Sequence, residues 1–463
     1  MADRLTVLDN SFFSLESPAV HMHVAGLAIL DPSTRPDGRL DVETVAELIE
    51  RRIHLVPRFR QKIAFVPFGA ARPVWVDDPK FDIDFHLRRA ALPAPGGRRE
   101  LADYVQRVHS RHLDRTKSLW EMYVIEGLED GHVAILAKIH HAMIDGMSGI
   151  DIASVLYDVT PEPRPVEPAV WIAKPEPSSS DLLRDALIEQ VTNPLKAGVE
   201  TINDLIQRPA VALTQAQRLV DGLTGILTAG TAQSSPFNVR VGPNRRFAMA
   251  EAPVSDFKHV KNALGGTVND VVLACVGGAL HRFLTRRGLP SAGQTMRTMV
   301  PVSTRDDSQR MAMGNRVTNL FVDIPVGPME PADRLRAVSA VTKDLKSSHQ
   351  ALGAEAIMTA GSWAPPTIHA LAARLFARQR FMNLVVSNVP GPQVPLYLAG
   401  ARLIVNYPMM PLAETVALSI AVTSLAGVMG FGFTGDWDAV PDVDFLAESL
   451  VASLEDLKKV AGS

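Results

Sequence analysis

The sequence predicts an α/β fold in which two mixed halves of similar size have a cleft between them. The chain has 463 residues, which is too long for one ordinary hydrophobic core and favours two or three domains. Strand-like and helix-like segments occur on both sides of a proline-rich break. Apolar residues make up 46% of the chain and charged residues 21%, which is the composition of a globular protein.

The first half carries several clearly periodic segments. Residues 24–30 form an apolar run that predicts a strand, and residues 43–53 place apolar side chains at helical spacing. Residues 101–113 predict a second helix. Two further apolar runs, 123–125 and 133–139, are joined through Glu-Asp-Gly and therefore predict a hairpin.

A proline-rich segment separates the two halves. Six prolines and a run of three serines fall within residues 161–180, which excludes a regular helix or a central strand and predicts an extended linker. Residues 181–230 return to helical spacing, which we interpret as a connecting helical layer; a mobile cover over a lipid site is the alternative. We therefore divide the chain into an N-terminal domain (1–160), a connecting segment (161–234) and a C-terminal domain (235–463).

The second half predicts one long helix and five strands. The helix covers residues 267–284, and Thr267 has the right side chain for its N-cap. The last two strands flank Leu425-Ala426-Gly427 and predict a second hairpin. The five strand candidates are the apolar runs 299–302, 316–324, 384–387, 417–424 and 428–434.

Charge and cysteine content exclude several classes of protein. The formal net charge is −3 and the isoelectric point is near 6.5. Because no Lys/Arg block stands out, we expect no nucleic-acid partner. The single cysteine, Cys275, excludes an internal disulfide and a multi-cysteine metal site. It lies in an apolar run, which predicts a buried and unreactive thiol.

The hydropathy pattern predicts a cytoplasmic protein that touches lipid. The N-terminus lacks the basic and then apolar pattern of a signal peptide, and no uninterrupted apolar stretch of about 18 residues predicts a spanning helix. The mean hydropathy of +0.08 is nevertheless high for a soluble enzyme, which leaves room for contact with a lipid surface.

Two adjacent histidines, His140 and His141, are the most informative feature of the chain. An apolar run ends at them, Asp145 and Gly146 follow at short spacing, and residues 148–159 predict a helix. A histidine at a strand-to-turn junction with an aspartate four positions further on can be the general base of a transfer reaction. Glycine at the last position permits a backbone conformation that a side chain would strain.

Strand alternation makes the two histidines unequal. Adjacent strand residues point to opposite faces, so His141 shares a face with Ile135 and Ile139, whereas His140 shares the other face with Lys138. One histidine therefore catalyses and the other supports it, and His141 is our candidate for the base. Asp145 either sets the tautomer of the imidazole directly or anchors the turn through an arginine.

Three other interpretations of the histidine pair were weighed. A metal site needs three or more ligands, and no cysteine or other close cluster of histidine and carboxylate residues completes one. A structural pair of buried histidines is the second alternative, although the spacing to Asp145 and Gly146 favours catalysis. A nucleophilic triad is not indicated, because the sequence lacks a Gly-x-Ser-x-Gly elbow.

The pattern His-His-x-x-x-Asp-Gly resembles the active-site motif of the bacterial wax ester synthase/acyl-CoA:diacylglycerol acyltransferases. This family belongs to the superfamily that also holds chloramphenicol acetyltransferase and the condensation domains of peptide synthetases. One departure is Ser118, which stands where the family has the proline of its Pro-Leu-Trp block. Further short matches follow in order along most of the chain: Leu8-Asp9, Phe12, Glu16, Met22-His23-Val24, Trp75-Val76-Asp77-Asp78-Pro79, Phe81-Asp82, Leu113-Asp114-Arg115, Leu119-Trp120-Glu121, Thr267-Val268-Asn269-Asp270, Pro301-Val302-Ser303, Gly314-Asn315-Arg316 and Ser387-Asn388-Val389-Pro390-Gly391-Pro392.

The resemblance implies a fold and a reaction. The fold would be two chloramphenicol-acetyltransferase-like mixed-sheet domains with an active-site tunnel at their interface. The reaction would be O-acyl transfer from acyl-CoA to diacylglycerol or to a long-chain fatty alcohol, which gives triacylglycerol or a wax ester. His141 would take the proton of the acceptor hydroxyl, whose oxygen attacks the thioester directly without an acyl-enzyme. Acyl-CoA would be a co-substrate, and we expect no resident cofactor and no metal.

The resemblance also assigns roles to individual residues. Asn269 would donate its side-chain amide to the tetrahedral oxyanion, with a helix-cap role as the alternative. Glu16 and Trp120 would line the acceptor channel. Arg305 and Arg316 would pair with Asp145 or receive CoA phosphates, with a surface or interdomain salt bridge as the alternative. The expected catalytic residues are His141, His140, Asp145 and Asn269; the residues expected around the substrates are Gly146, Glu16, Trp120, Asp270, Arg305 and Arg316, of which Asp270, like Asp145, would mainly support the local structure.

Two further functions stay open at this point. One is an acyltransferase of the same superfamily that acts on a polyketide or peptidyl alcohol. The other is a non-catalytic scaffold on lipid inclusions, against which the intact histidine motif argues. We expect a monomer, because two halves already make one cleft, and peripheral contact with the inner face of the membrane or with lipid inclusions.

Overall fold

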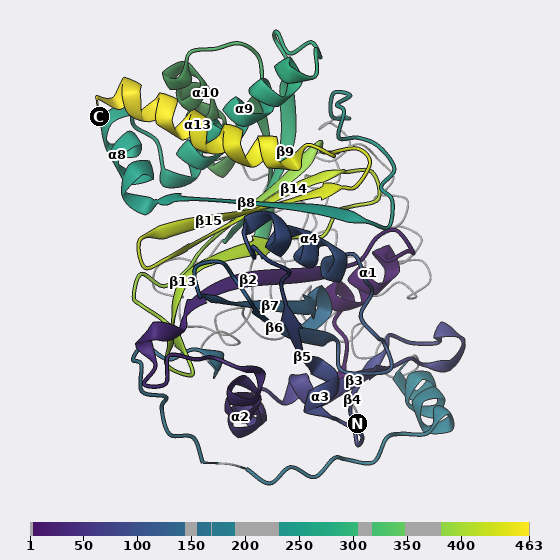
Figure 1. The fold of residues 1–463 in the computed structure, drawn as a ribbon. Helices are drawn as coiled ribbons and strands as arrows, with labels where there is room; N and C mark the ends of the chain where they lie inside the picture. Colours follow the sequence, from purple (N-terminus) through teal and green to yellow (C-terminus); the bar gives the residue numbers. More distant parts are fainter. Residues whose placement is uncertain are drawn as a thin grey trace, which may run out of the picture.

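The computed structural model describes residues 3–143, 155–167, 169–189, 231–303, 317–347 and 381–462. These residues form two six-stranded mixed sheets with helices packed against them, and a three-stranded sheet near the N-terminus (Figure 1). The predicted α/β class with two mixed halves is therefore confirmed.

The N-terminal sheet has the strand order β12-β13-β2-β7-β6-β5. Strands β5 and β6 are parallel, and the other neighbours are antiparallel. The register pairs His23 with His140, so both imidazoles start from the same end of this sheet. The strands are β2 (His23–Asp31), β5 (Leu87–Ala91), β6 (Trp120–Glu126), β7 (Val133–His140), β12 (Tyr397–Leu398) and β13 (Ala401–Met409).

The C-terminal sheet has the strand order β10-β9-β11-β14-β15-β8. Its three central strands β9, β11 and β14 are parallel, and the flanking pairs are antiparallel. The strands are β8 (Arg245–Pro253), β9 (Thr295–Ser303), β10 (Val317–Pro325), β11 (Leu384–Pro390), β14 (Leu418–Leu425) and β15 (Val428–Asp436).

Four helices lie together above the C-terminal sheet: α8 (Val254–Leu264), α9 (Val268–Arg286), α10 (Pro331–Ser347) and α13 (Val443–Ala461) (Figure 1). Their apolar faces and the sheet share one large core that contains Phe257, Phe283, Phe431 and Phe433, all fully buried. Cys275 lies in this core, and burial raises the pKa of its thiol, which confirms the predicted unreactive cysteine.

The N-terminal half carries shorter helices and a small sheet. The helix α1 begins with a capping box in which Thr6 and Asp9 exchange side-chain to backbone hydrogen bonds. The helices are α1 (Val7–Leu15), α2 (Val42–Arg52), α3 (Ile83–His86) and α4 (Arg98–His109), with the 3-10 turns η1 (Pro32–Thr34), η2 (Ile53–Leu55), η3 (Pro57–Arg60), η4 (Pro67–Gly69) and η5 (His141–Met143); the small sheet contains β1 (Asp3–Arg4), β3 (Gln61–Ala64) and β4 (Val74–Asp77).

Strand β13 belongs to the N-terminal sheet although it comes from the C-terminal half of the sequence. It packs directly against β15 of the other sheet. An added Cβ at Gly430 would lie 2.2 Å from the carbonyl oxygen of Asn406, and one at Gly432 would lie 1.9 Å from that of Pro408. Glycine at these two positions therefore lets the backbones of the two sheets touch. The predicted C-terminal domain (235–463) contains residues 397–409. In the structure, these residues join the N-terminal sheet instead.

Most predicted elements are present with shifted ends. The strands at 24–30 and 133–139, the helix at 43–53 and both hairpins are confirmed. The predicted helix at 101–113 instead runs from 98 to 109, because Glu100 accepts a hydrogen bond from the Gly97 amide and fixes an earlier start. Of the predicted helix at 148–159, only residues 155–159 are described; the helix there ends at Leu156, because Asp158 pairs with Tyr397 in a β-bridge. Most of 181–230 lies outside the described residues. In the predicted linker 161–180, the described residues up to 178 have no helix or strand, as predicted. A helix begins at Ser179, inside the predicted linker, because Ser178 and Asp181 exchange the hydrogen bonds of a helix cap.

The described helices were compared with the length and hydropathy that a membrane span requires. Among the described residues, no single helix is long and apolar enough to cross a bilayer, and only the bent pair α8 and α9, at 98° to each other, meets the length and composition test together.

Candidate active site

The two histidines occupy the predicted strand-to-turn junction. His140 is the last residue of β7, and His141 is the first residue of η5. The His140 amide donates to the carbonyl oxygen of Leu119 at 2.9 Å, and the His141 amide donates to that of Met22 at 2.8 Å. Both backbone positions are thereby tied to the segments that enter the neighbouring strands β6 and β2.

Two consecutive phenylalanines of α1 stack on the two histidines. The Phe12 and His141 ring centroids are 4.1 Å apart, and the Phe13 and His140 centroids are 4.3 Å apart. Phe12 also packs against the cores of both halves of the molecule. The imidazole of His141 therefore lies where the two halves meet, as predicted for a cleft residue.

His140 lies almost fully buried beside Glu16. It is 1% exposed, and its Nδ1 accepts a hydrogen bond of 3.1 Å from the amide of Ala142. Because Nδ1 is an acceptor, the ring carries its N–H at Nε2. Nε2 is 3.4 Å from Oε1 of Glu16, but its N–H is not aligned for a hydrogen bond. The contact with Glu16 is thus electrostatic.

Glu16 is a buried carboxylate beneath His140. Its Oε1 accepts a hydrogen bond of 2.9 Å from the amide of Met22, and its Oε2 accepts one from the guanidinium of Arg115. Burial raises the pKa of Glu16, but His140, the Met22 amide and Arg115 outweigh this and lower the pKa to about 2. A permanent negative charge therefore lies beside His140. The predicted role of Glu16 along the acceptor channel stays a prediction.

The electrostatic environment keeps His141 unprotonated. Burial and the neighbouring His140 lower its pKa to about 4. The imidazole is therefore neutral at pH 7, which is the form that can accept a proton. Its Nδ1 is buried and has no hydrogen-bond partner among the described residues. Asp145, the predicted partner, lies outside them.

A group of buried basic residues behind the two histidines was not predicted. Burial lowers the pKa of His21 to about 4 and the pKa values of His23 and His109 well below the usual range. Burial also lowers the pKa of Lys138 to about 8, and its ammonium donates to the Val108 carbonyl at 3.0 Å. The His-x-His at 21–23 and the His-x-x-His at 109–112 are the sequence signals that could have indicated this group.

The start of α9 places Asn269 for contact with β11. Thr267, rather than Asn269, is the N-cap, because its Oγ1 accepts a hydrogen bond of 3.2 Å from the Asp270 amide. The cap alternative for Asn269 is therefore wrong. Its Oδ1 accepts a hydrogen bond of 3.2 Å from Nδ2 of Asn388. This leaves Nδ2 of Asn269, the proposed donor, without a partner in the described part of the chain.

Asp270 supports the local structure. It is 2% exposed, and its carboxylate accepts hydrogen bonds from the Thr267 amide at 2.8 Å and from the Thr342 hydroxyl at 2.7 Å. The side chain therefore joins the start of α9 to α10, which is the structural role expected of it.

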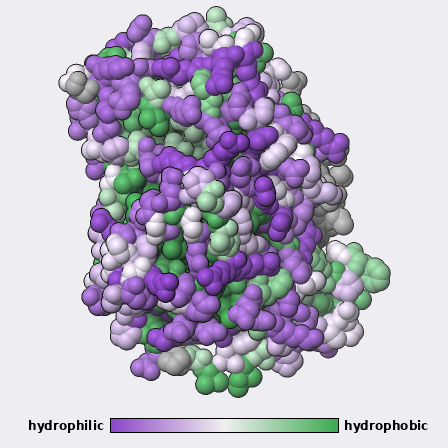
Figure 2. All heavy atoms as spheres, in the orientation of Figure 1, coloured by the Kyte–Doolittle hydropathy of each residue, from purple (hydrophilic) through white to green (hydrophobic). Residues whose placement is uncertain are grey.

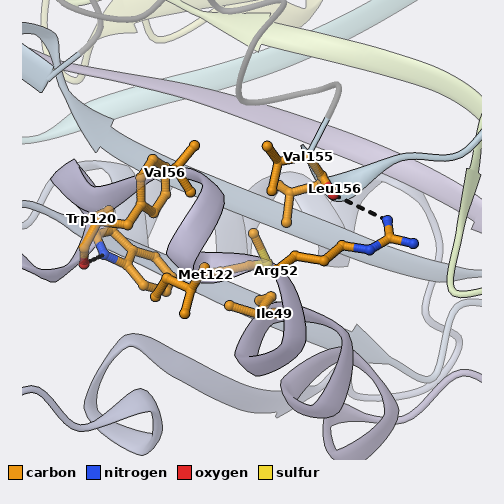
Figure 3. Close-up of a pocket in the computed structure, with 9 residues that line it drawn as sticks. Ile49, Arg52, Val56, Trp120, Met122, Val155 and Leu156 are labelled. Atoms are coloured by element: carbon orange, nitrogen blue, oxygen red, sulfur yellow. Dashed lines mark hydrogen bonds between the residues drawn. The ribbon is translucent and has the colours of Figure 1, made fainter. Parts of the chain in front are cut away.

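Trp120 lies in the core of the N-terminal half (Figure 3). It is 2% exposed, its Nε1 donates to the carbonyl oxygen of Phe59 at 2.9 Å, and it stacks on His86 at 4.6 Å. The cavity beside it, lined also by Ile49 and Met122, measures about 20 Å³, which is enough for about one water molecule. A role for Trp120 along an acceptor channel stays a prediction.

Ser118, at the departure from the family pattern, is also buried, and its hydroxyl lies 3.5 Å from the Arg58 carbonyl oxygen. Four predicted site residues, Asp145, Gly146, Arg305 and Arg316, lie outside the described residues. Among the described candidates, Glu16, His140 and His141 lie together around α1, Asn269 and Asp270 lie at the start of α9, and Trp120 lies apart in the N-terminal core.

Two mixed-sheet halves that meet beside a histidine pair at a strand end are the architecture of the chloramphenicol-acetyltransferase-like acyltransferases. The family model of the wax ester synthase/diacylglycerol acyltransferase catalytic domain matches residues 5–272, and the model of the WS/DGAT C-terminal domain matches residues 313–458. The chain belongs to the WS/DGAT family, as the sequence motifs predicted.

Individual relatives agree with this assignment. A probable diacylglycerol O-acyltransferase (tgs2) of Mycobacterium tuberculosis is 36% identical over 465 residues, which cover 98% of each chain. The wax ester synthase/diacylglycerol acyltransferase of Marinobacter aquaeolei VT8 is 26% identical with a TM-score of 0.70, over 99% of this chain and 100% of that one. The starter condensation domain of rhizomide synthetase has a TM-score of 0.58 at 12% identity, over 100% and 95% of the two chains, and shares the fold alone.

Proposed function

We propose that this protein transfers a long acyl chain from acyl-CoA to the hydroxyl of diacylglycerol or of a long-chain fatty alcohol. The observation that carries the proposal is the neutral imidazole of His141, which is stacked on Phe12 and lies where the two halves meet. The family membership of the chain supports the same reaction class.

The proposed step is a direct displacement at the thioester. The His141 imidazole takes the proton of the acceptor hydroxyl while the oxygen attacks the thioester carbonyl carbon, which contributes about 10²–10⁴-fold to the rate. The side-chain amide of Asn269 donates to the tetrahedral oxyanion. When the intermediate collapses, the bond to sulfur breaks, and the CoA thiolate leaves and takes the proton from the imidazolium.

This mechanism needs no resident metal or cofactor, which is part of the proposal. Among the described residues, Glu16, His23 and His112 are the group that could bind a metal ion, because their possible donor atoms lie within 4.8 Å of one another. We expect full turnover after dialysis against EDTA. Loss of activity that added Zn²⁺ restores would contradict a metal-free reaction.

We also propose that the protein works in peripheral contact with a lipid surface. The support comes from exposed apolar side chains on the N-terminal half, because Phe68 is 95% exposed and Phe65 is 48% exposed. Figure 2 shows apolar surface at the lower right edge of the molecule, the side where Figure 1 places the end of the small sheet. The Phe65 ring is 6.0 Å from that of Phe13, which stacks on His140. Aromatic contacts thus lead from the surface to the histidine pair.

Flotation with liposomes tests the lipid contact. We expect the protein to rise with the vesicles, and we expect Phe68→Ser to reduce the floating fraction, because it removes an exposed aromatic ring. The matched control is Val460→Ser, an exposed apolar residue on α13. Wild-type protein found wholly at the bottom of the gradient would count against lipid contact. The predicted cytoplasmic location and monomeric state remain proposals, and light scattering on the purified protein tests the latter.

Labelled palmitoyl-CoA offered with diacylglycerol or with hexadecanol tests the reaction. Triacylglycerol or wax ester is the expected product, and the ratio of the two gives the acceptor preference. Acylation of a polyketide or peptidyl alcohol but of neither lipid would favour the other acyltransferase function. Droplet binding without any product would favour the scaffold.

A further inference from the structure

A groove lies on the helical layer of the C-terminal half, between α9, α10 and α13. Its volume is about 550 Å³, which is within the range of small-molecule sites. It occupies the C-terminal half of the 19-residue helix α9, whereas Asn269 lies at the N-terminal end of the same helix. The groove is therefore separate from the proposed reaction site. Its lining includes Gly278, Arg282, Arg286, Arg334, Phe445 and Ser453.

Arg334 is a buried cation in the wall of this groove. It is 5% exposed, its Nε donates to the Pro325 carbonyl at 3.2 Å, and its Nη2 donates to the Gly327 carbonyl at 2.7 Å. Both partners are neutral, and no carboxylate in the described ranges lies within ion-pair distance of this guanidinium. Burial lowers its pKa, and the nearby Arg282 lowers it further. A buried charge without a counter-charge is unfavourable, so an anion would stabilise this site.

The third nitrogen of Arg334 is available to a ligand. Nη1 has no hydrogen-bond partner among the described residues, and it lies 3.5 Å from the point where a Cβ of Gly278 would stand. Gly278 and Ser453 both line the groove beside this nitrogen, and the Ser453 hydroxyl lies 2.6 Å from the same point. The guanidinium thus keeps one pair of N–H donors for an incoming group.

The charges around the groove are unequal in number. Arg282 pairs with Asp456, so these two charges cancel each other. Glu330 lies exposed at the rim. Arg286 and Arg334 therefore face one remaining carboxylate, and the lining has an excess of positive charge.

Apolar groups lie beside these cations. The guanidinium carbon of Arg286 is 4.2 Å from the centroid of the Phe445 ring, and this stacking fixes the direction of the guanidinium. Met329, which is 42% exposed, and Leu457 complete the apolar part of the lining. The groove therefore offers cationic donors and apolar surface within one cavity of metabolite size.

We propose that this groove binds a small amphipathic anion. A phosphate or carboxylate group would meet Arg334 and Arg286, because a guanidinium fork matches the oxygens of either group. The apolar part of the same molecule would lie against Phe445 and Met329.

Calorimetric titration of the full-length protein with three related compounds tests the proposal. At constant ionic strength, phenyl phosphate and benzoate carry the two candidate anionic groups, and benzyl alcohol is the uncharged control. We expect at least one anion to bind and benzyl alcohol to give no binding heat. Tighter binding of phenyl phosphate would assign the site to phosphate esters, and tighter binding of benzoate would assign it to carboxylates.

Variants locate the binding in the groove. Arg286→Gln and Arg334→Gln should each raise the dissociation constant of the anion at least about tenfold, because each removes a charged hydrogen-bond donor. Since Arg334→Gln also removes two structural hydrogen bonds, Arg286→Gln on the exposed rim is the decisive variant. Arg336→Gln, an exposed arginine of α10 that pairs with Asp333, is the matched control and should bind like the wild type.

Three results would overturn the proposal. The first is that neither anion binds at concentrations up to about 10 mM. The second is that benzyl alcohol binds as tightly as the anions. The third is that Arg286→Gln binds the anion with unchanged affinity.

Discussion

The two six-stranded sheets have similar mixed architectures but bury different chemistry. The N-terminal sheet surrounds His23, Lys138 and His140, which are almost fully buried ionisable residues. The C-terminal sheet instead buries a continuous apolar core that includes Phe431 and Phe433. Asp270 and Arg334 are also buried in the C-terminal half, but they lie in its helices and not among its central strands. Because burying an ionisable group costs free energy that an apolar group does not, the buried histidines and Lys138 lower the stability of the N-terminal half.

The difference also explains why the candidate site is divided. The proposed proton acceptor, His141, comes from the N-terminal half, where burial lowers the pKa values of His141 and His23. The C-terminal half contributes a neutral amide pair, Asn269 and Asn388, at the edge of its apolar core. A base needs a tuned pKa, whereas an amide donor needs only a fixed position.

The strongest test of this comparison is removal of the proposed base. We expect His141→Ala to lower kcat about 10²–10⁴-fold with little change in stability, because the proton acceptor is lost. His259→Ala, on the exposed side of α8 in the other half, should keep full turnover. Steady-state transfer of labelled palmitate measures both variants. Full activity of His141→Ala would show that the base lies elsewhere.

The next test concerns the contribution of the C-terminal half. Asn269→Ala should lower kcat about 10²–10³-fold, which is the usual loss for one oxyanion donor. Thr267→Ala should instead lower the free energy of unfolding by about 1 kcal/mol and leave turnover unchanged, because it removes only the helix cap. If Asn269→Ala melted earlier but turned over normally, the amide would have a structural role.

Acid should destabilise the protein through the N-terminal half. His21 and His141 have pKa values of about 4 in the folded chain, against about 6.5 when unfolded. Between these values the unfolded chain binds protons that the folded chain does not. Stability is therefore complete above about pH 6.5 and falls toward pH 4, by up to about 1.4 kcal/mol per pH unit for each histidine.

Urea unfolding between pH 7.5 and pH 5 measures this slope, and carboxylates contribute little in that range. His21→Gln should reduce the slope by about one proton. A stability that does not vary with pH over this range would contradict the proposed neutral, buried imidazoles.

The smallest expected effect concerns Glu16. Glu16→Gln should lower kcat about tenfold with KM unchanged, because it keeps the shape but removes the negative charge beside His140. Glu251→Gln, on β8 of the other sheet, is the matched control and should have no effect on either constant. A raised KM with unchanged kcat would instead place Glu16 along the acceptor channel.

The sequence predicts the parts of this fold that depend on local patterns. The strand β7 is an apolar run, and β14 and β15 flank a glycine turn, so periodicity alone identifies them. Strand β13 was missed because Pro408 interrupts its pattern and its partner β2 is far away in the chain. The buried group of His21, His23 and His109 depends on packing between separate segments, which no local pattern contains.

For the candidate site too, the sequence predicts the part that depends on local patterns. The junction at His140 and His141 follows from one strand and its turn. The stacking of Phe12 and Phe13 on these rings could not be predicted, because it depends on how α1 packs across the ends of two strands.

The contact of Gly430 and Gly432 with β13 limits how the enzyme can admit its substrates. Because carbonyl oxygens of one sheet occupy the space of the missing side chains in the other, the two halves cannot slide past each other there. Any opening of the cleft must then pivot about this contact. An alanine at either glycine would push β13 and β15 apart. It would thereby change the distance between His141 and Asn269, although it touches neither residue.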